Sequence, residues 1–196
     1  MNKRKGRPKE FDEEQALALA MHYFWENGYD ASSLRDLLIA MGIGKSSFYQ
    51  TFGCKEDLFR RSLELYTQSS VEYIRSLLAE KTSKEVLLYL PQTLLEELKE
   101  TGKTKGCLLM NSGAECYKQH PQISDLIEYE YKTFLELFAE LIASAKASGD
   151  ISDTTPDPAL ASIYSSLLNG LIAVIQAGAS KQQIEAVMGH IEQVLR

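Results

Sequence analysis

The sequence predicts an all-α protein with a small N-terminal head of three helices, built around a helix-turn-helix, and a larger helical C-terminal domain. Three observations lead to this fold class. Apolar residues recur at helical spacing along the chain, and no segment alternates apolar and polar residues as a strand would. Glycines and prolines separate the periodic segments. We expect the head to span residues 1–55 and the second domain residues 56–196.

Charge is distributed unevenly along the 196 residues. Residues 1–61 carry a net charge of +1, and the remainder carries −7. Five basic side chains precede the first acidic residue, namely Lys3, Arg4, Lys5, Arg7 and Lys9. A basic tip on an acidic body suits a protein that touches phosphates at one end, although a solubilising tail has the same composition. The three cysteines are too few and too scattered for a disulfide framework, and the start of the chain has no secretory signal, so a cytoplasmic location is expected.

Turn and cap residues set the expected helix ends in the head. Acidic residues open the first helix, and Gly28 follows its end. Ser33 is expected to cap the second helix, with Asp36 three residues on, and Gly42 to end it. The expected spans are 12–27, 34–41 and 45–51.

The rest of the chain predicts six further helices. A run without charge covers residues 158–180 and is long enough to cross a bilayer, but serines, an asparagine and a glutamine interrupt it. A buried helix is therefore the better interpretation of this run. The expected spans are 55 to beyond 75, 84–100, 107–117, 121–148, 158–177 and 180–195.

The stretch from residue 33 to 51 has the spacing of a helix-turn-helix. Two short helices flank the turn Met41-Gly42-Ile43, where glycine can take left-handed geometry. The core between the two helices is expected to contain Leu37, Leu38, Ile43 and Phe48. The outward side chains, which can meet phosphate oxygens and base edges, are expected to be Lys45, Ser46, Tyr49 and Gln50. Taken alone, the pattern fits a plain helical hairpin equally well.

The residues from Gly42 to Leu58 resemble the signature of the TetR family of transcriptional regulators. That signature is a turn glycine, a short recognition helix that ends in aromatic-Tyr-x-x-Phe, and a Lys-Glu-x-Leu that opens the fourth helix. Upstream, Phe24, Gly28-Tyr29 and Ser33 also match, so the resemblance spans about residues 11–61. The family usually has serine or threonine where Gly44 stands, which makes Gly44 itself a weak contact candidate.

The resemblance implies a dimeric repressor that a small-molecule effector releases from a palindromic operator in double-stranded DNA. Lys45 and Ser46 would approach base edges, and Tyr49 would pack on the sugar-phosphate backbone. Ser33 and Lys55 would hold phosphates at the starts of two helices. The full set of expected DNA contacts is Ser33, Lys45, Ser46, Ser47, Tyr49, Gln50, Thr51 and Lys55.

An enzyme or a cofactor-binding protein is not expected. The three histidines, His22, His120 and His190, are isolated, and none has the spacing of a metal site or belongs to a nucleophile motif. The alternative function is that of a helical small-molecule-binding protein or enzyme that does not bind DNA.

The segment from Lys105 to Ser112 resembles a TetR branch that includes electrophile-sensing repressors, in which a cysteine at this place is the sensor. Cys107 lies at an expected helix start near Lys103 and Lys105, and both features lower a thiol pKa. The alternative is an ordinary core cysteine. We expect a neutral or cationic, partly aromatic effector, sensed or bound by Cys107, Met110, Tyr117, Tyr131, Phe134 and Tyr164.

The last two helices are expected to pair with the same helices of a second copy, with no membrane involved. Small residues would allow close approach, namely Ala161, Ser165, Asn169 and Ala173. The apolar area would come from Leu160, Ile163, Leu167, Leu168, Leu171 and Ile175.

Overall fold

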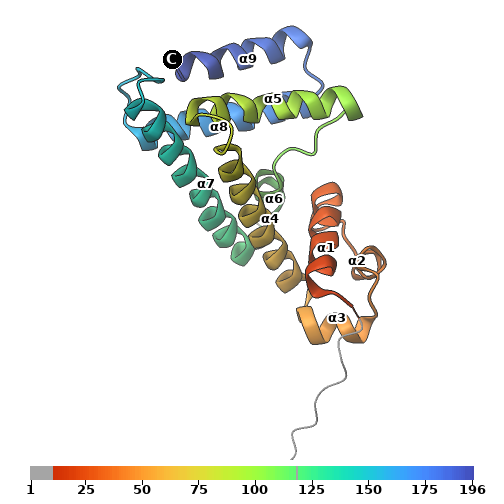
Figure 1. The fold of residues 1–196 in the computed structure, drawn as a ribbon. Helices are drawn as coiled ribbons and strands as arrows, with labels where there is room; N and C mark the ends of the chain where they lie inside the picture. Colours follow the sequence, from red (N-terminus) through yellow and green to blue (C-terminus); the bar gives the residue numbers. More distant parts are fainter. Residues whose placement is uncertain (1–10, 118) are drawn as a thin grey trace, which may run out of the picture. The chain divides into compact units, whose positions relative to one another are not determined.

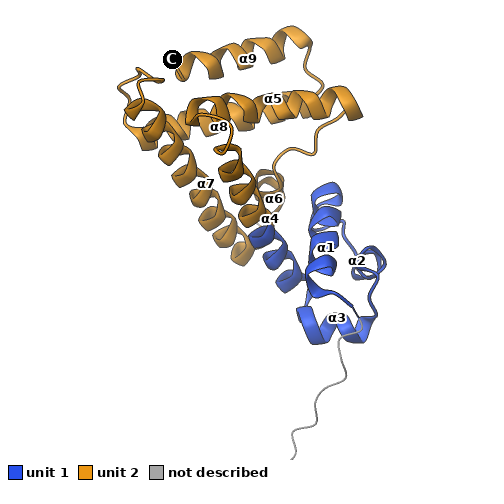
Figure 2. Cartoon of the chain, in the orientation of Figure 1, with its two compact units in different colours: residues 1–65 blue, residues 66–196 orange. Residues whose placement is uncertain are grey.

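The computed structural model describes residues 11–117 and 119–196, in which every regular element is an α-helix (Figure 1). The basic tip predicted at residues 3–9 lies outside the described residues. The chain divides into two compact units, residues 1–65 and 66–196 (Figure 2). The division falls inside one long helix, α4. The prediction of an all-helical fold is confirmed.

Unit 1, the head, is a bundle of short helices whose ends are set by local caps. The Asp12 carboxylate accepts hydrogen bonds from the amides of Glu14 and Gln15 at 2.9 and 3.1 Å, which satisfies two donors at the start of the first helix. Gly42 ends the second helix in the left-handed conformation, with φ of 66°. The helices are α1 (Glu13–Asn27), α2 (Leu34–Met41), α3 (Lys45–Phe52) and the beginning of α4 (Lys55–Leu77).

Aromatic side chains form much of the core of the head. The Phe59 ring lies 4.7 Å from the rings of both Phe24 and Tyr29, measured between centroids. Of the four core residues predicted for the helix-turn-helix, Leu37 and Phe48 are fully buried. The other two, Leu38 and Ile43, are only half-buried.

Unit 2, the body, is built around α7. Helices α5, α6 and α8 each pack against α7, and α9 packs against α8 (Figure 1). The predicted helices are all present, with ends within a few residues of expectation. They are α5 (Ser83–Thr101), α6 (Leu108–Cys116), α7 (Pro121–Ala147), α8 (Asp157–Gln176) and α9 (Lys181–Val194).

Helix α5 contains a proline, Pro91, and the body compensates for the hydrogen bond that this proline removes. Proline has no amide hydrogen, so the carbonyl of Leu87, four residues earlier, receives no donor from its own helix. The hydroxyl of Tyr164 on α8 donates to that carbonyl at 2.7 Å. Tyr164 is fully buried, and burial raises the pKa of its hydroxyl far above the usual range, so the group remains a donor. Tyr164, predicted to bind effector, is thus a core residue that links α8 to α5.

Helix α8 is buried on one face only. By length and composition it would be able to span a membrane, a property it shares with many core helices. Its buried side chains are Leu160, Ala161, Tyr164, Ser165, Leu171, Ile172 and Ile175. The assignment of Leu160, Ala161, Ser165, Leu171 and Ile175 to an interface between copies is therefore wrong, because these side chains pack inside their own chain. The prediction of a buried helix holds for that face alone.

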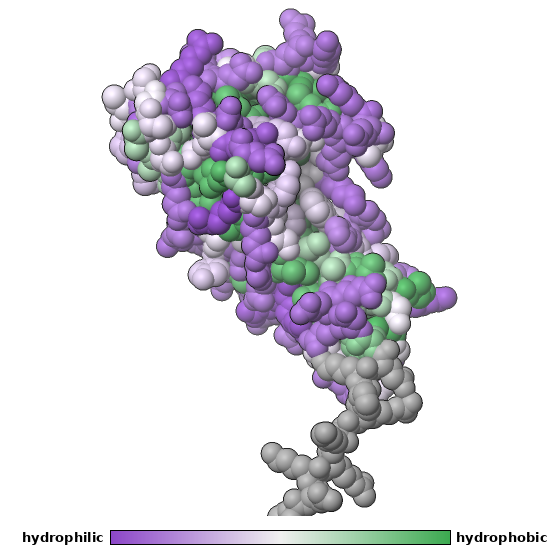
Figure 3. Space-filling model, in the orientation of Figure 1, coloured by the Kyte–Doolittle hydropathy of each residue, from purple (hydrophilic) through white to green (hydrophobic). Residues whose placement is uncertain are grey.

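The opposite face of α8 is exposed and combines small with apolar residues. Ile163 is 43% exposed, a large fraction for an isoleucine. Ser162, Ser166, Gly170 and Ala173 are also exposed. On the face of the molecule drawn in Figure 3, hydrophobic residues reach the surface in separate patches on both units.

The Tyr164–Leu87 hydrogen bond predicts a thermodynamic cycle. Tyr164→Phe should lower the free energy of unfolding by about 1–3 kcal/mol, because it leaves the buried Leu87 carbonyl without a donor. In a Pro91→Ala background the amide of residue 91 restores the helical hydrogen bond, so the same Tyr164→Phe change should cost clearly less. Urea unfolding of the four proteins measures the coupling. Equal costs in both backgrounds would show that the Leu87 carbonyl does not depend on Tyr164.

Candidate nucleic-acid interface

Helix α3 divides its side chains cleanly between core and surface. Phe48 and Phe52, one turn apart, are buried beneath the helix. The four residues predicted to face outward, Lys45, Ser46, Tyr49 and Gln50, are exposed, and Ser47 and Thr51 are half-buried. Tyr49 is 49% exposed, although its ring also meets the edge of Phe48 at 5.4 Å. The outward face thus presents a cation, hydroxyls and an amide on a helix that the core fixes from below.

The turn before α3 depends on one glycine more than on the other. Gly42 has φ of 66°, and an L side chain there would be strained. Gly44 caps α3 with extended backbone and no side-chain hydrogen bond, and a Cβ there would meet no atom within 4 Å. A serine or threonine, usual in this position of the TetR pattern, would therefore fit at residue 44.

The two predicted phosphate contacts at helix starts are both engaged with neighbours. The Ser33 hydroxyl accepts from the Asp36 amide at 3.2 Å and donates to the Asp36 carboxylate at 2.5 Å, which confirms the predicted cap of α2. The ammonium of Lys55, at the start of α4, lies 4.3 Å from the centroid of the Tyr29 ring. This contact holds the Lys55 side chain near the surface in a restricted set of conformations.

Arg61 on α4 joins three parts of the head and was not singled out from the sequence. Its guanidinium donates to the Glu13 carboxylate on α1 at 2.8 Å and to the carbonyl of Thr51 on α3 at 3.4 Å. The same group lies 4.9 Å from the centroid of the Phe52 ring. Arg61 therefore fixes the C-terminal end of the exposed helix against α1 and α4. Helical periodicity cannot distinguish it from its neighbour Arg60, because the contact depends on how the helices pack.

The residues predicted to bind or sense an effector do not form one cluster. Met110, Tyr117 and Tyr131 line a groove between α6 and α7. Phe134 is buried and packs between Tyr66 and Phe138, and Tyr164 belongs to the core described above.

Cys107 precedes α6, but its thiol pKa is not lowered as predicted. The amides of Met110 and Leu109 and the hydroxyl of Tyr66 hydrogen-bond to the sulfur and favour the thiolate. Burial outweighs them, so the pKa of the Cys107 thiol is raised. The expectation from the helix start and the two lysines is wrong, because it left out the desolvation of the sulfur beside Tyr66. The thiol is thus protonated at neutral pH.

No group of three or more His, Cys, Asp or Glu side chains in residues 11–117 and 119–196 is arranged to hold a metal ion. The exposed polar side chains of α3 can bind a ligand through hydrogen bonds and charge. A rigid helix with exposed polar side chains suits the edges of bases and the phosphates of a nucleic acid.

Family models match both units. Residues 16–61 match the model of bacterial regulatory proteins of the tetR family, and residues 85–191 match a tetracyclin repressor-like C-terminal domain. The chain belongs to the TetR family. This regulator is therefore a helix-turn-helix transcriptional regulator and not an enzyme, and the alternative of a helical protein that does not bind DNA is set aside.

Individual relatives agree with this assignment. This TetR-family chain is 31% identical over 153 residues to the uncharacterized HTH-type transcriptional regulator YezE of Bacillus subtilis, covering 78% of this chain and 79% of YezE. It is 27% identical over 191 residues to the HTH-type transcriptional repressor ComR of Escherichia coli, covering 96% of this chain and 91% of ComR. Among solved structures, a cysteine mutant of the TetR-family regulator CifR, complexed with 26-base-pair operator DNA, is 29% identical. That match has a TM-score of 0.76 and covers 97% of this chain and 98% of CifR.

The role of Arg61 in this TetR-family head leads to a matched comparison. Arg61→Gln should weaken binding to the DNA upstream of the regulator's own gene roughly tenfold more than Arg60→Gln does, since about 1.4 kcal/mol of positioning is lost. Both variants remove one positive charge, but Arg60 has no hydrogen bond or ion pair among the described residues. Unfolding free energy should fall by about 1 kcal/mol or less, because the ion pair is partly exposed. Equal losses of DNA affinity in a mobility-shift titration would remove the positioning role.

Proposed function

We propose that this regulator represses transcription by binding a palindromic operator as a homodimer, and that a small-molecule effector releases it. The observation that carries the proposal is the exposed polar face of α3 above the buried Phe48 and Phe52, in a chain of the TetR family. ComR and BdcR of Escherichia coli carry the name of transcriptional repressor, and CifR has been seen on operator DNA. The work of such a repressor is done in the cytoplasm, where the DNA is.

Each side chain of the proposed interface has a role that its chemistry supports. Lys45 and Ser46 approach base edges in the major groove, while the Tyr49 ring packs on the sugar-phosphate backbone. Lys55 and the amides at the start of α4 hold a phosphate. The remaining members of the interface are Ser33, Ser47, Gln50 and Thr51.

A second copy of the chain would cover the exposed face of α8 together with α9. Ser162, Ser166, Gly170 and Ala173 permit close approach of two helices, and Ile163 supplies apolar area that water otherwise contacts. This set replaces most of the residues expected from the sequence. Two heads of a symmetric dimer would then read two half-sites about 34 Å apart.

Effector release requires a ligand that binds one state of the dimer better than the other. A ligand with equal affinity for the operator-bound and released states does not change the equilibrium between them. We place the effector at the groove between α6 and α7, which Met110, Tyr117 and Tyr131 line. From the sequence, residues 1–55 were expected to bind DNA and residues 56–196 to bind the effector. The proposal keeps DNA binding in the head and effector binding in the body.

Replacing Tyr49 tests the DNA interface. Tyr49→Ala should weaken operator binding roughly 10- to 100-fold, because it removes ring packing and a hydroxyl from a partly exposed position without opening the core. A mobility-shift titration at several salt concentrations measures the affinity, and wild-type binding should fall steeply with salt. The variant should still be a dimer of about 44 kDa, twice the 22.0 kDa of the chain, in light scattering. Unchanged affinity, or a monomer in the wild type, would contradict the proposal.

The raised pKa of Cys107 predicts how the repressor responds to electrophiles. A protonated thiol is a poor nucleophile, so quinones and aldehydes should release operator DNA from the wild type and from Cys107→Ser to the same extent at pH 7. Any modification of Cys107 should become faster as pH rises towards the thiol pKa. Mass spectrometry after brief treatment measures this rate. Release confined to the wild type at pH 7 would restore Cys107 as a sensor and remove the reversible site from the mechanism.

A further inference from the structure

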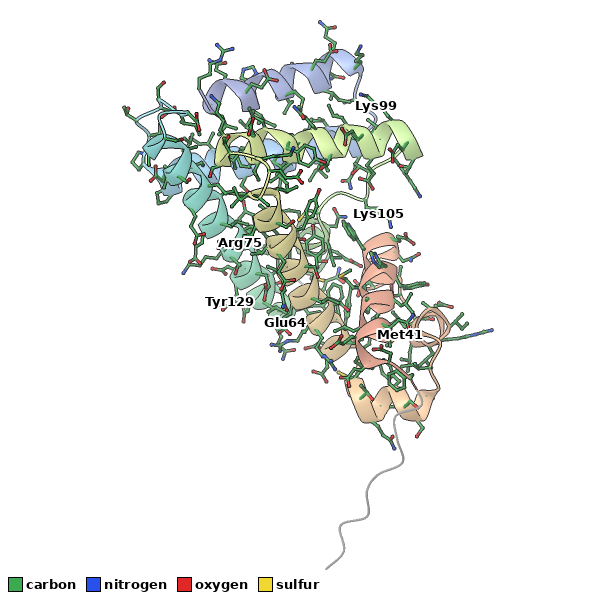
Figure 4. The ribbon with its side chains drawn as sticks, in the orientation of Figure 1. Met41, Glu64, Arg75, Lys99, Lys105 and Tyr129 are labelled. Atoms are coloured by element: carbon green, nitrogen blue, oxygen red, sulfur yellow. The ribbon has the colours of Figure 1, made fainter. Side chains whose placement is uncertain are left out.

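The groove between α6 and α7 is a cavity of about 440 Å³ that opens to solvent. Its walls come from α6, from the start and middle of α7, and from Tyr117, which follows α6. The lining residues are Met110, Gly113, Tyr117, Pro121, Ser124, Asp125, Ile127, Glu128 and Tyr131. A second hollow of about 430 Å³ on α7 shares Asp125, Glu128 and Tyr131 and adds the exposed Tyr129 (Figure 4). The two hollows form one continuous surface along α7.

Aromatic rings give this groove its apolar character. Tyr117 is 74% exposed, a large fraction for a tyrosine side chain. Tyr131 is held in place from behind, since its hydroxyl lies 2.9 Å from that of Ser165 on α8. Gly113 adds no side chain to the lining, and the Ile127 side chain lies beside it. A flat aromatic group therefore has ring surfaces to pack against.

The charged side chains that line the groove, among the described residues, are both carboxylates. Asp125 and Glu128 are both exposed carboxylates one turn apart, and neither forms an ion pair with another described residue. Among the residues that the structure describes, no lysine or arginine lines the groove. Lys132 borders the second hollow, but its ammonium lies 3.9 Å from Glu136, one turn further on. These carboxylates would repel an anionic ligand, and a neutral one would gain only hydrogen bonds from them, without the attraction between opposite charges.

We propose that the groove between α6 and α7 binds an organic cation that carries aromatic rings. The cation is attracted by the carboxylates of Asp125 and Glu128, and the faces of Tyr117 and Tyr131 interact with both its charge and its rings. The regulatory consequence rests on the proposed function, in which this groove is the effector site. Binding of the cation to the groove does not depend on the proposed function.

The probe for the test is tetraphenylphosphonium, and tetraphenylborate is its control of nearly the same shape and opposite charge. Isothermal titration of the full chain without DNA measures direct binding. The wild type should bind the phosphonium, and its affinity should fall as salt screens the carboxylates. Tetraphenylborate should bind at least about tenfold more weakly, since it meets two like charges. Equal binding of the two ions would overturn the proposal.

Two glutamates on α7 provide a matched pair of variants. Glu128→Gln should weaken phosphonium binding about two- to fivefold, the size expected for one partly exposed charge. Glu136→Gln makes the same change in net charge eight residues further along, outside the groove. It also frees Lys132 from an exposed ion pair, so any loss of affinity should be clearly smaller than that of Glu128→Gln. Tyr117→Ala should reduce binding further without loss of stability, because the ring is exposed. Identical affinities for Glu128→Gln and Glu136→Gln would show that the groove is not the site.

Operator release separates this inference from the proposed function. If the phosphonium binds in the groove but does not release operator DNA, the ligand class stands and the assignment of the groove as effector site fails. If it releases DNA from both the wild type and Glu128→Gln at equal concentration, regulation stands and the groove proposal fails. Failure of the wild type to bind any operator would remove the repressor function and leave the calorimetric result intact.

Discussion

The carbonyl of Leu87 lacks a hydrogen-bond donor four residues on in its own helix, and another helix of the body supplies one. Pro91 removes the donor, and the hydroxyl of Tyr164 replaces it across the core. The Tyr164 ring meets the edge of Phe138 on α7 at 5.1 Å, so one side chain touches α5 and α7 from α8. A buried hydrogen bond of this kind fixes the rotation of α8 about its axis. That rotation decides which face of α8 is buried and which is exposed.

The head uses a polar anchor of a different kind. Arg61 is partly exposed, so its contacts with Glu13 and Thr51 add little to stability. Their value lies in geometry, because they join the end of α3 to two other helices. The buried bond of Tyr164 holds a core together, whereas the exposed bonds of Arg61 hold a surface in place. In the proposed function the second kind matters for DNA binding, since a recognition helix must present several side chains in fixed register.

The fold was predictable because its signals are local. Helical periodicity, the acidic residues that open α1, the cap at Ser33 and the turn at Gly42 gave the helices to within a few residues, and the recognition-helix motif gave the exposed face of α3. What failed depends on packing between distant segments. Helix α8 has small and apolar residues on both faces and serines on both, so its sequence does not say which face is buried, and Ala161 and Ser165 were placed on the wrong one. The pKa of Cys107 and the role of Tyr164 follow from the partners Tyr66 and Leu87, which only the folded chain brings near.

The separation of tasks on α3 has an evolutionary consequence. Phe48 and Phe52 anchor α3 in the core, while Lys45, Ser46 and Gln50 are exposed and Tyr49 is about half exposed against the edge of Phe48. Substitutions on the outward set are therefore close to neutral for folding, and natural selection can act on them through sequence preference alone. Gly44 extends this freedom, because the space around it admits a side chain. If α3 reads the operator as proposed, a few substitutions on this face would change the DNA sequence preference and leave the fold of the head intact.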